Sequence, residues 1–288
     1  MTLKQALNHA RGIFAANSME DARLESELLL RHTLNISQTQ LYIDLNRELS
    51  PEHEKVFQQL IERRLSGEPT AYIIGHREFY GLDFQVDPSV LIPRPESELL
   101  VEKALQLAQH RPLPTIAEIG TGCGAIAISL ALNLPRAKIY ATDISDSALK
   151  VARANCQKHG VLDRVHLLLG DMLDPLPEPA DLIVANLPYV KESELPARFP
   201  AGFEPQLALN GGEDGLEKIR ELSHQLNDRL HPEGYLLLEV GQGQEKVAIN
   251  HLSSLFPSAN IEVTPDLSGI DRVISLHLIK PSLPASGR

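Results

Sequence analysis

The spacing of apolar residues predicts a helical region at the start of the chain. Over residues 1–75, apolar side chains recur at the three- and four-residue intervals of a helix with one buried face. Ser50-Pro51 predicts the start of a later helix, because serine is a good N-cap and proline fits the first turn, and this helix should end near Gly67. We therefore expect residues 1–75 to form a small all-helical domain. Its clearest apolar stripe is Leu24, Leu28, Leu29 and Leu34.

From residue 96 onward, short apolar runs alternate with helical patterns, such as the one over Ser145–His159. This alternation predicts βαβ units and a mostly parallel sheet covered on both faces. The last two runs are joined by a segment too short for a crossover helix, so they should pair antiparallel. We expect an α/β, Rossmann-like, seven-stranded domain over residues 96–280. Its strands are expected at Ile116–Ile119, Lys138–Thr142, Val165–Leu169, Asp181–Ala185, Tyr235–Val240, Asn260–Thr264 and Arg272–Ile279.

Residues 76–95 differ from both regions. Aromatic and β-branched residues around Gly81 predict a β-hairpin. The run Leu91-Ile-Pro-Arg-Pro cannot be helical, because proline restricts its own backbone and that of the residue before it. We expect this stretch to be a hairpin linker between the two domains, and residues 281–288 to be a disordered tail.

Composition and charge argue against a nucleic-acid-binding, membrane-spanning, secreted or metal-binding protein. The net charge of −11 lies mostly in residues 96–280, which does not suit an enzyme that must neutralise nucleic-acid phosphates, so we expect no direct nucleic-acid contact. No apolar run approaches the roughly 20 residues of a membrane span, and the first residues lack the pattern of a signal peptide. Cys123 and Cys156 form no C-x-x-C pair, so we expect reduced thiols and no metal site. A cytoplasmic, monomeric protein without membrane contact is predicted.

A glycine-rich stretch, Glu118-Ile-Gly-Thr-Gly-Cys-Gly, follows the first expected strand and opens a helix. Glycine lets the backbone turn tightly and approach a ligand without a Cβ in the way. The spacing is G-x-G-x-G, which differs from the dinucleotide fingerprint, and no lysine follows as in a nucleoside-triphosphate loop. A tight turn without a ligand is the alternative. The predicted cofactor contacts in this loop are Gly120, Thr121, Gly122, Cys123 and Gly124.

Two further signals follow the next two strands. Asp143 ends the second strand, where a carboxylate can accept hydrogen bonds from ribose hydroxyls, although it could instead cap the following helix. Asp171 and Met172 follow the third strand, where the acid can meet an adenine amino group and the thioether can cover the ring. Open α/β sheets bind ligands at the carboxyl ends of their strands. We therefore predict S-adenosylmethionine as the cofactor and S-adenosylhomocysteine as its product.

The fourth strand is followed by Asn186-Leu187-Pro188-Tyr189, which resembles the Asn-Pro-Pro-Tyr motif of the amino-methyltransferases. The resemblance implies that the Asn186 oxygen and the Leu187 carbonyl accept the two N–H bonds of the target nitrogen, and that Asn186 also lies at the cofactor. Pro188 and Tyr189 complete the substrate site, with Tyr189 offering a face to the planar group. Leu187 replaces a proline of the motif, but the role at this position belongs to its carbonyl. The alternative is a polar loop end with a core tyrosine.

Longer segments resemble the release factor glutamine methyltransferases, and Arg94-Pro95-Glu96 fits this branch rather than the methyltransferases of ribosomal proteins. Ser97 stands where that family usually has threonine. The resemblance implies a glutamine in a Gly-Gly-Gln motif of a peptide-chain release factor as the target, with the helical domain helping to bind that partner. An adenine methyltransferase of nucleic acid and a non-catalytic S-adenosylmethionine-binding module are the alternatives. The matching segments are Gly67–Leu82, Leu91–Leu100, Leu207–Leu216, Tyr235–Gln244 and Asp266–Val273.

Overall fold

The computed structural model describes residues 1–109, 111–195 and 201–279. The chain divides into two compact units. One contains Met1–His76 with residues 201–203, and the other contains residues 77–195 and 204–279. The tail predicted at residues 281–288 lies outside the described residues. No helix in the described ranges is long and apolar enough to span a membrane.

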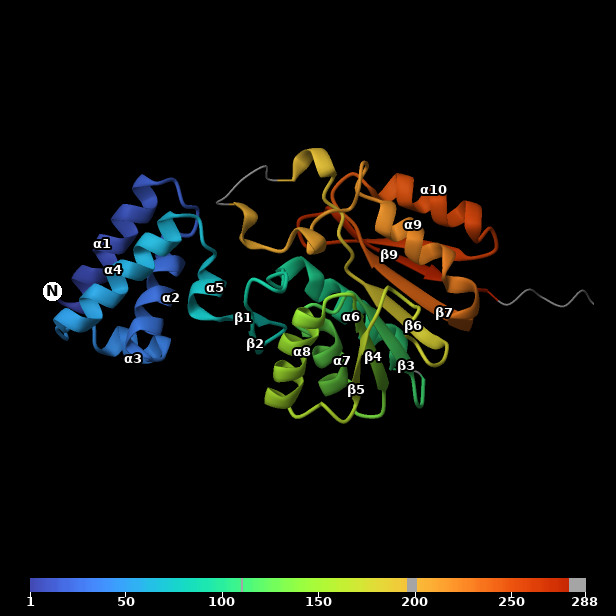
Figure 1. Ribbon diagram of the computed structural model, residues 1–288, viewed down its shortest axis with the longest axis horizontal. Helices are drawn as coiled ribbons and strands as arrows, with labels where there is room; N and C mark the ends of the chain where they lie inside the picture. The colour runs from blue at the N-terminus through green and yellow to red at the C-terminus, as the bar shows by residue number, and fades with distance from the viewer. Residues whose placement is uncertain (110, 196–200, 280–288) are drawn as a thin grey trace, which may run out of the picture. The chain divides into compact units, whose positions relative to one another are not determined.

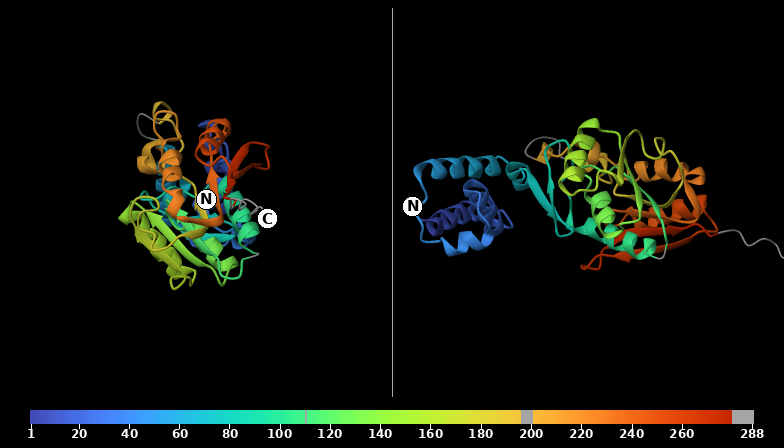
Figure 2. Two further views of the ribbon diagram at one scale, coloured as in Figure 1. Left: turned by 90° about the vertical axis from the view of Figure 1, so that its right-hand side faces the viewer. Right: turned by 90° about the horizontal axis from the view of Figure 1, so that it is seen from below.

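The first unit is all-helical, as predicted. Its helix α4 lies alongside α1 and α2 (Figures 1 and 2), and the three share a core that includes Leu7, Phe14, Leu29 and Ile61. Ser50 caps α4 by accepting a hydrogen bond from a backbone N–H of the first turn, with proline at the first helical position. The helices are α1 (Leu3–Ala16), α2 (Ala22–Leu34), α3 (Gln38–Ile43), α4 (Pro51–Leu65) and α5 (Thr70–Ile74).

The apolar stripe predicted on α2 is wrong at Leu24, whose side chain is 50% exposed. The buried face of the helix instead contains Glu27, which a hydrophobicity pattern places outside. Its carboxylate accepts hydrogen bonds from Arg11 Nη2 at 2.7 Å and from the Tyr42 hydroxyl at 2.6 Å. A buried charge with such partners is tolerated, so α2 can turn this face inward.

The predicted hairpin is present as β1 (His76–Phe79) and β2 (Leu82–Gln85). The two turn residues, Tyr80 and Gly81, have φ values of 52° and 70°, as the favoured two-residue hairpin turn requires. The hairpin packs on α8 (Asp146–Lys158), where the amide of Asn155 exchanges two hydrogen bonds with the backbone of Gln85. Residues 77–95 are therefore part of the second compact unit.

The second unit contains the predicted seven-stranded sheet, in the order β5-β4-β3-β6-β7-β9-β8. The first five strands in this order pair parallel, and β9 pairs antiparallel with both β7 and β8. The chain proceeds outward from β3 to β5 and then returns to β6 on the other side of β3, which creates a crevice at the carboxyl ends of the strands. The strands are β3 (Thr115–Ile119), β4 (Lys138–Asp143), β5 (Val165–Leu169), β6 (Ala180–Ala185), β7 (Leu230–Glu239), β8 (Asn260–Pro265) and β9 (Asp271–His277).

Helices cover both faces of this sheet, as expected for a mainly parallel sheet. On one side lie α6 (Glu98–Ala108), α7 (Ala125–Asn133) and α8, and on the other lie α9 (Glu217–His224) and α10 (Glu245–Leu255) (Figure 1). Apolar residues of α9 and α10 pack in one core with alternate residues of β3, β6, β7 and β9. The architecture is the Rossmann-like methyltransferase fold that the sequence predicted.

Candidate active site

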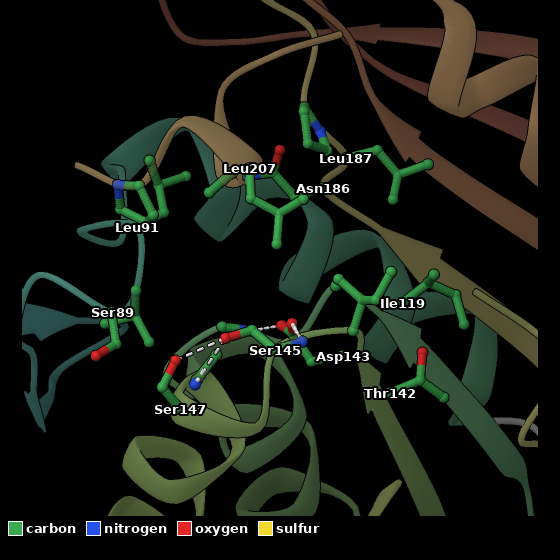
Figure 3. A pocket seen from close by; sticks show the side chains of 18 of the residues that line it. Ser89, Leu91, Ile119, Thr142, Asp143, Ser145, Ser147, Asn186, Leu187 and Leu207 are labelled. Carbon is green, nitrogen blue, oxygen red and sulfur yellow. Dashed lines mark hydrogen bonds between the residues drawn. The ribbon is translucent and has the colours of Figure 1, made fainter. Parts of the chain in front are cut away.

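A cavity of about 440 Å³ lies at the carboxyl ends of β3, β4, β5 and β6 (Figure 3). Its volume is in the range of small-molecule sites. Asp143, Ser145 and Ser147 lie at one end, and Asn186, Leu91 and Leu207 lie at the other. Eight of the predicted site residues line it: Gly120, Gly122, Asp143, Asp171, Met172, Asn186, Leu187 and Pro188.

The glycine-rich loop brings its backbone to the cavity. Gly120, Gly122 and Gly124 all have positive φ, a conformation that side chains rarely adopt. The Gly120 N–H donates a hydrogen bond to the Thr142 carbonyl at 3.0 Å, which fixes the loop to the end of β4. A Cβ on Gly120 would meet the Leu187 side chain at 3.8 Å. The loop therefore lies directly against the segment that follows β6.

The other predicted residues of this loop do not line the cavity. The Thr121 hydroxyl donates to Glu118 Oε2 at 2.6 Å, and the Ala127 N–H donates to the same oxygen at 2.9 Å. Burial raises the pKa of Glu118 to about 8, and burial likewise raises the pKa of the Cys123 thiol to about 12. Gly124 is the N-cap of α7. These residues therefore contribute to the internal packing and hydrogen bonding of the loop rather than to the cavity wall.

Asn155 is a support of the loop that no sequence motif indicated. It is fully buried on α8, and its amide nitrogen donates to the Cys123 carbonyl at 2.9 Å as well as to the hairpin. The only sequence signal was an amide on the buried face of an amphipathic helix, which is too general to identify a role. The structure shows that the hairpin, α8 and the glycine-rich loop are joined through this side chain.

Asp143 connects the end of β4 to the glycine-rich loop. Its Oδ2 accepts a hydrogen bond from the Gly122 N–H at 2.9 Å, and its Oδ1 accepts one from the Ser145 N–H at 2.9 Å. The N-cap of α8 is Ser145, whose hydroxyl accepts from the Ala148 N–H, so capping is not the role of Asp143. Burial raises the pKa of Asp143, while these backbone hydrogen bonds favour the charged form. Each carboxylate oxygen keeps a second lone pair for a ligand.

Two further residues of the cavity wall have features that are energetically unfavourable in the structure without a ligand: one has an unsatisfied hydroxyl and the other has a positive φ. The Thr142 hydroxyl is buried and has no hydrogen-bond partner among the described residues, a condition that costs free energy unless a ligand or water supplies one. Met172 is buried with a φ of 42°, a conformation that costs a non-glycine residue about 1–3 kcal/mol and that is often found at functional sites. Both observations fit a cavity shaped for a ligand with polar and apolar parts.

The far end of the cavity is built from the segment after β6. The Asn186 side chain lines the cavity, and its Nδ2 donates a hydrogen bond to Ser97 Oγ at 2.8 Å. Tyr189 does not line the cavity; its hydroxyl donates to Glu239 Oε1 at 3.4 Å. Burial raises the pKa of Tyr189 to about 12, so the phenol stays neutral at physiological pH. Ser97 and Glu239 were not predicted as site residues.

Two loops hold this segment in place. Gln244 Nε2 donates to the Tyr189 carbonyl at 2.9 Å, and the Gly211 N–H donates to the Val190 carbonyl at 2.8 Å. A Cβ on Gly211 would lie 2.7 Å from the Pro188 carbonyl oxygen. The glycine-rich stretch Asn210–Gly215 is thus a non-helical loop that packs directly against the segment after β6.

An ion pair joins the segments that carry the apolar residues Leu91 and Leu207 of the cavity wall. Arg94 Nη2 lies 2.5 Å from Glu204 Oε2, and Glu204 Oε1 accepts a hydrogen bond from the Ile92 N–H at 3.1 Å. Leu91 and Leu207 form the neighbouring wall, and Leu207 is 57% exposed (Figure 3). Within the described ranges, no group of three or more His, Cys, Asp and Glu side chains could hold a metal ion.

Comparison with known proteins agrees with this architecture. Residues 5–75 match the family model of the PrmC N-terminal domain, and residues 95–201 match the methyltransferase small domain. The release factor glutamine methyltransferase of Moorella thermoacetica is 45% identical over 94% of this chain and 97% of its own length. That of Geobacter sulfurreducens is 38% identical over 95% of both chains. The chain belongs to the release factor glutamine methyltransferase family.

Solved structures support the fold of this family member. A methyltransferase from Pyrococcus furiosus superposes with a TM-score of 0.54 at 20% identity, covering 70% of this chain and 91% of that chain. The catalytic domain of hMettl16 superposes with a TM-score of 0.56 at 18% identity, covering 77% of this chain and 83% of that chain. Both solved structures show the methyltransferase fold of this chain. The family resemblance predicted from the sequence is confirmed by the relatives from Moorella thermoacetica and Geobacter sulfurreducens.

Proposed function

We propose that this protein transfers a methyl group from S-adenosylmethionine to the side-chain amide nitrogen of a glutamine in the Gly-Gly-Gln motif of a peptide-chain release factor. The observation that carries the proposal is the placement of Asn186 on the cavity wall, with its amide nitrogen bonded to Ser97 and its oxygen left to accept. Membership of the family supports the same target.

The opposite end of the cavity suits S-adenosylmethionine, which supplies an electrophilic methyl group when bound. Gly120 and Gly122 offer backbone without side chains, and Asp143 can accept hydrogen bonds from the ribose hydroxyls. The Thr142 hydroxyl, which has no hydrogen-bond partner in the part of the chain that the structure describes, supports a polar ligand here. Asp171 would accept a hydrogen bond from the adenine and Met172 would give it an apolar surface, and the position of both residues on the cavity wall supports this assignment.

At the Asn186 end of the cavity, the protein would act mainly by orienting the target amide nitrogen toward the methyl group. An amide nitrogen is a poor nucleophile because its lone pair is delocalised into the carbonyl. The Asn186 oxygen and the Leu187 carbonyl would accept its two N–H bonds and hold it in line with the methyl carbon, which is the positioning and electrostatic contribution that such a reaction needs. The nitrogen gives up one proton to solvent as its new bond to carbon forms. Tyr189, which does not line the cavity, would support this end through its backbone, whose carbonyl accepts a hydrogen bond from Gln244, rather than offer its ring to the planar group.

We further propose that the helical unit, with residues 1–75 as predicted, docks the release factor. Its separate core supports an independent role. Removal of these residues should leave S-adenosylmethionine affinity unchanged and strongly lower methylation of an intact release factor, while a short Gly-Gly-Gln peptide should be affected little, since it lacks the second contact. Equal losses for both substrates, or loss of cofactor affinity, would contradict docking.

The function is tested by incubating the full chain with labelled S-adenosylmethionine and a release factor, followed by mass mapping of the product. We expect one methyl group on the glutamine of the Gly-Gly-Gln motif. Label on adenine in nucleic acid would favour the first alternative, and cofactor binding without transfer to any substrate would favour a non-catalytic module. A cytoplasmic location and a monomeric state stay predictions from the sequence.

A further inference from the structure

Two walls of the cavity come from segments that are far apart in the sequence. The hairpin strand β2 ends at Gln85 and leads into residues 88–91, which line the cavity. The glycine-rich loop lines it with Gly120 and Gly122, and the two walls lie on different sides of the cavity (Figure 3). The separation of these walls therefore depends on contacts between distant residues.

The side chain of Asn155 connects the two segments. Its Nδ2 donates one hydrogen bond to the Gln85 carbonyl and another to the Cys123 carbonyl, both at 2.9 Å. Its Oδ1 accepts a hydrogen bond from the Gln85 N–H at 2.8 Å. These partners fix the orientation of the amide, because a carbonyl can only accept and a backbone N–H can only donate. One amide proton is thus used for each segment.

The packing around Asn155 leaves little room for another arrangement. Asn155 is fully buried, so water has no access to replace its hydrogen bonds. A Cβ on Gly124 would lie 3.4 Å from the Cβ of Ala152, one turn before Asn155 on α8, so the loop packs on the helix face that carries the amide. Cys123 directly follows Gly122, and a shift of the Cys123 carbonyl would therefore move the cavity wall at Gly122.

We propose that Asn155 is a positioning residue that holds residues 88–91 and the glycine-rich loop at the separation that S-adenosylmethionine requires. The inference rests on the proposed function, because it takes this cofactor as the ligand of the cavity. Asn155 does not line the cavity and acts through the two segments that it joins. Without it, part of the binding free energy would be spent on ordering the two walls, as for any site that is not preorganised.

The test measures the dissociation constant of S-adenosylmethionine by calorimetry for the full-length wild type and for Asn155→Ala. We expect about tenfold weaker binding in the variant, the scale of one or two lost buried hydrogen bonds. In methylation assays the KM for S-adenosylmethionine should rise by a similar factor. The kcat at saturating cofactor should stay within about twofold, because Asn186 and Ser97 keep their contact. Unchanged affinity, or a loss confined to kcat, would overturn the inference.

Two control variants separate this role from a merely structural one. Lys158→Ala removes the ion pair with Asp83, a second contact between α8 and the hairpin that does not involve the glycine-rich loop. Val165→Ala removes buried volume at the start of β5 and lowers thermal stability. Both variants should bind S-adenosylmethionine like the wild type. If either loses as much affinity as Asn155→Ala, the inference is wrong.

Asn155→Asp provides a test that does not depend on Asn155→Ala folding. The carboxylate keeps the shape of the side chain and an acceptor for the Gln85 N–H, but it has no proton for either carbonyl, so binding should again weaken. Wild-type affinity in this variant, beside a wild type that binds, would contradict the inference alone. If the wild-type protein itself binds no S-adenosylmethionine, the proposed function fails first and this inference fails with it.

Discussion

The two ends of the cavity are built in different ways. At the end proposed to bind the cofactor, the wall is formed by backbone groups and by side chains that bind neighbouring backbone, as Asp143 does with Gly122 and Ser145. At the other end, the amide of Asn186 is bound by the side chain of Ser97, which lies 89 residues earlier in the chain.

This difference explains how the segment after β6 accommodates Leu187 in place of a proline. A proline there would restrict the backbone of Asn186 locally. In this protein the restraint comes from outside the segment, because Gln244 and Gly211 bind the backbone of Tyr189 and Val190. The segment after β6 can therefore tolerate leucine at position 187, because contacts from distant residues hold its backbone. A loop held only by its own backbone conformation could not tolerate such a change.

The largest expected effect is at the amide end, for Asn186→Ala. Removing the acceptor at the reacting centre should cost about 2.7–4 kcal/mol of transition-state stabilisation, or about a hundredfold to a thousandfold in kcat. S-Adenosylmethionine affinity, measured by calorimetry as the control, should be retained because the cofactor end is held separately. Turnover near the wild-type rate would show that Asn186 has no role in the reaction.

At the cofactor end, Asp143→Ala should weaken S-adenosylmethionine binding by about 1.5–3 kcal/mol, since it removes a charged acceptor. The glycine-rich loop should also loosen, because Gly122 loses its partner. Asp146→Ala is the matched control, because this side chain is 65% exposed and pairs with Lys150 on the surface. Calorimetry should separate the two variants, and similar affinities would leave Asp143 without a binding role.

Gly215→Ala should disrupt the packing of the loop Asn210–Gly215 against Gln244 and the segment after β6. A Cβ there would lie 2.4 Å from Gln244 Nε2 and from the Tyr189 carbonyl oxygen. Gly160→Ala is the control, because it has the same left-handed backbone with open space around it and should lose only about 1–2 kcal/mol of unfolding free energy. Overpacking should cost Gly215→Ala about 1–3 kcal/mol more in urea unfolding. Equal losses would mean that the loops move apart freely.

The smallest effect on site geometry is expected for Glu118→Gln, because a glutamine oxygen can accept the same hydrogen bonds from Thr121 and Ala127. The folded-state pKa of about 8 exceeds the unfolded value of 4.5, so the folded protein keeps a proton that the unfolded chain releases. Wild-type stability should therefore fall as pH rises between these values. The variant should lose this part of the slope in urea unfolding at pH 5 and pH 8; an unchanged slope would mean that Glu118 is charged in the fold.

Much of the fold could be predicted from periodicity. The βαβ alternation predicted the parallel sheet, and the short final connection predicted the antiparallel pairing of β8 with β9. The prediction failed for the buried face of α2, because periodicity treats Glu27 as a surface residue. Its partners Arg11 and Tyr42 lie on other helices, so no local pattern could show that this carboxylate is compensated.

The sequence by itself determined that the glycine-rich loop, Asp143 and Asn186 lie at the ends of β3, β4 and β6. The residues at these places follow strands of one parallel sheet, and the sheet brings its carboxyl ends together whatever the intervening segments contain. Only the tertiary structure decided which side chain binds Asn186, because Ser97 contacts it from a segment 89 residues earlier in the chain. Hydrogen bonds between side chains depend on angstrom-scale placement, and that placement exists only once the sheet and its helices have packed.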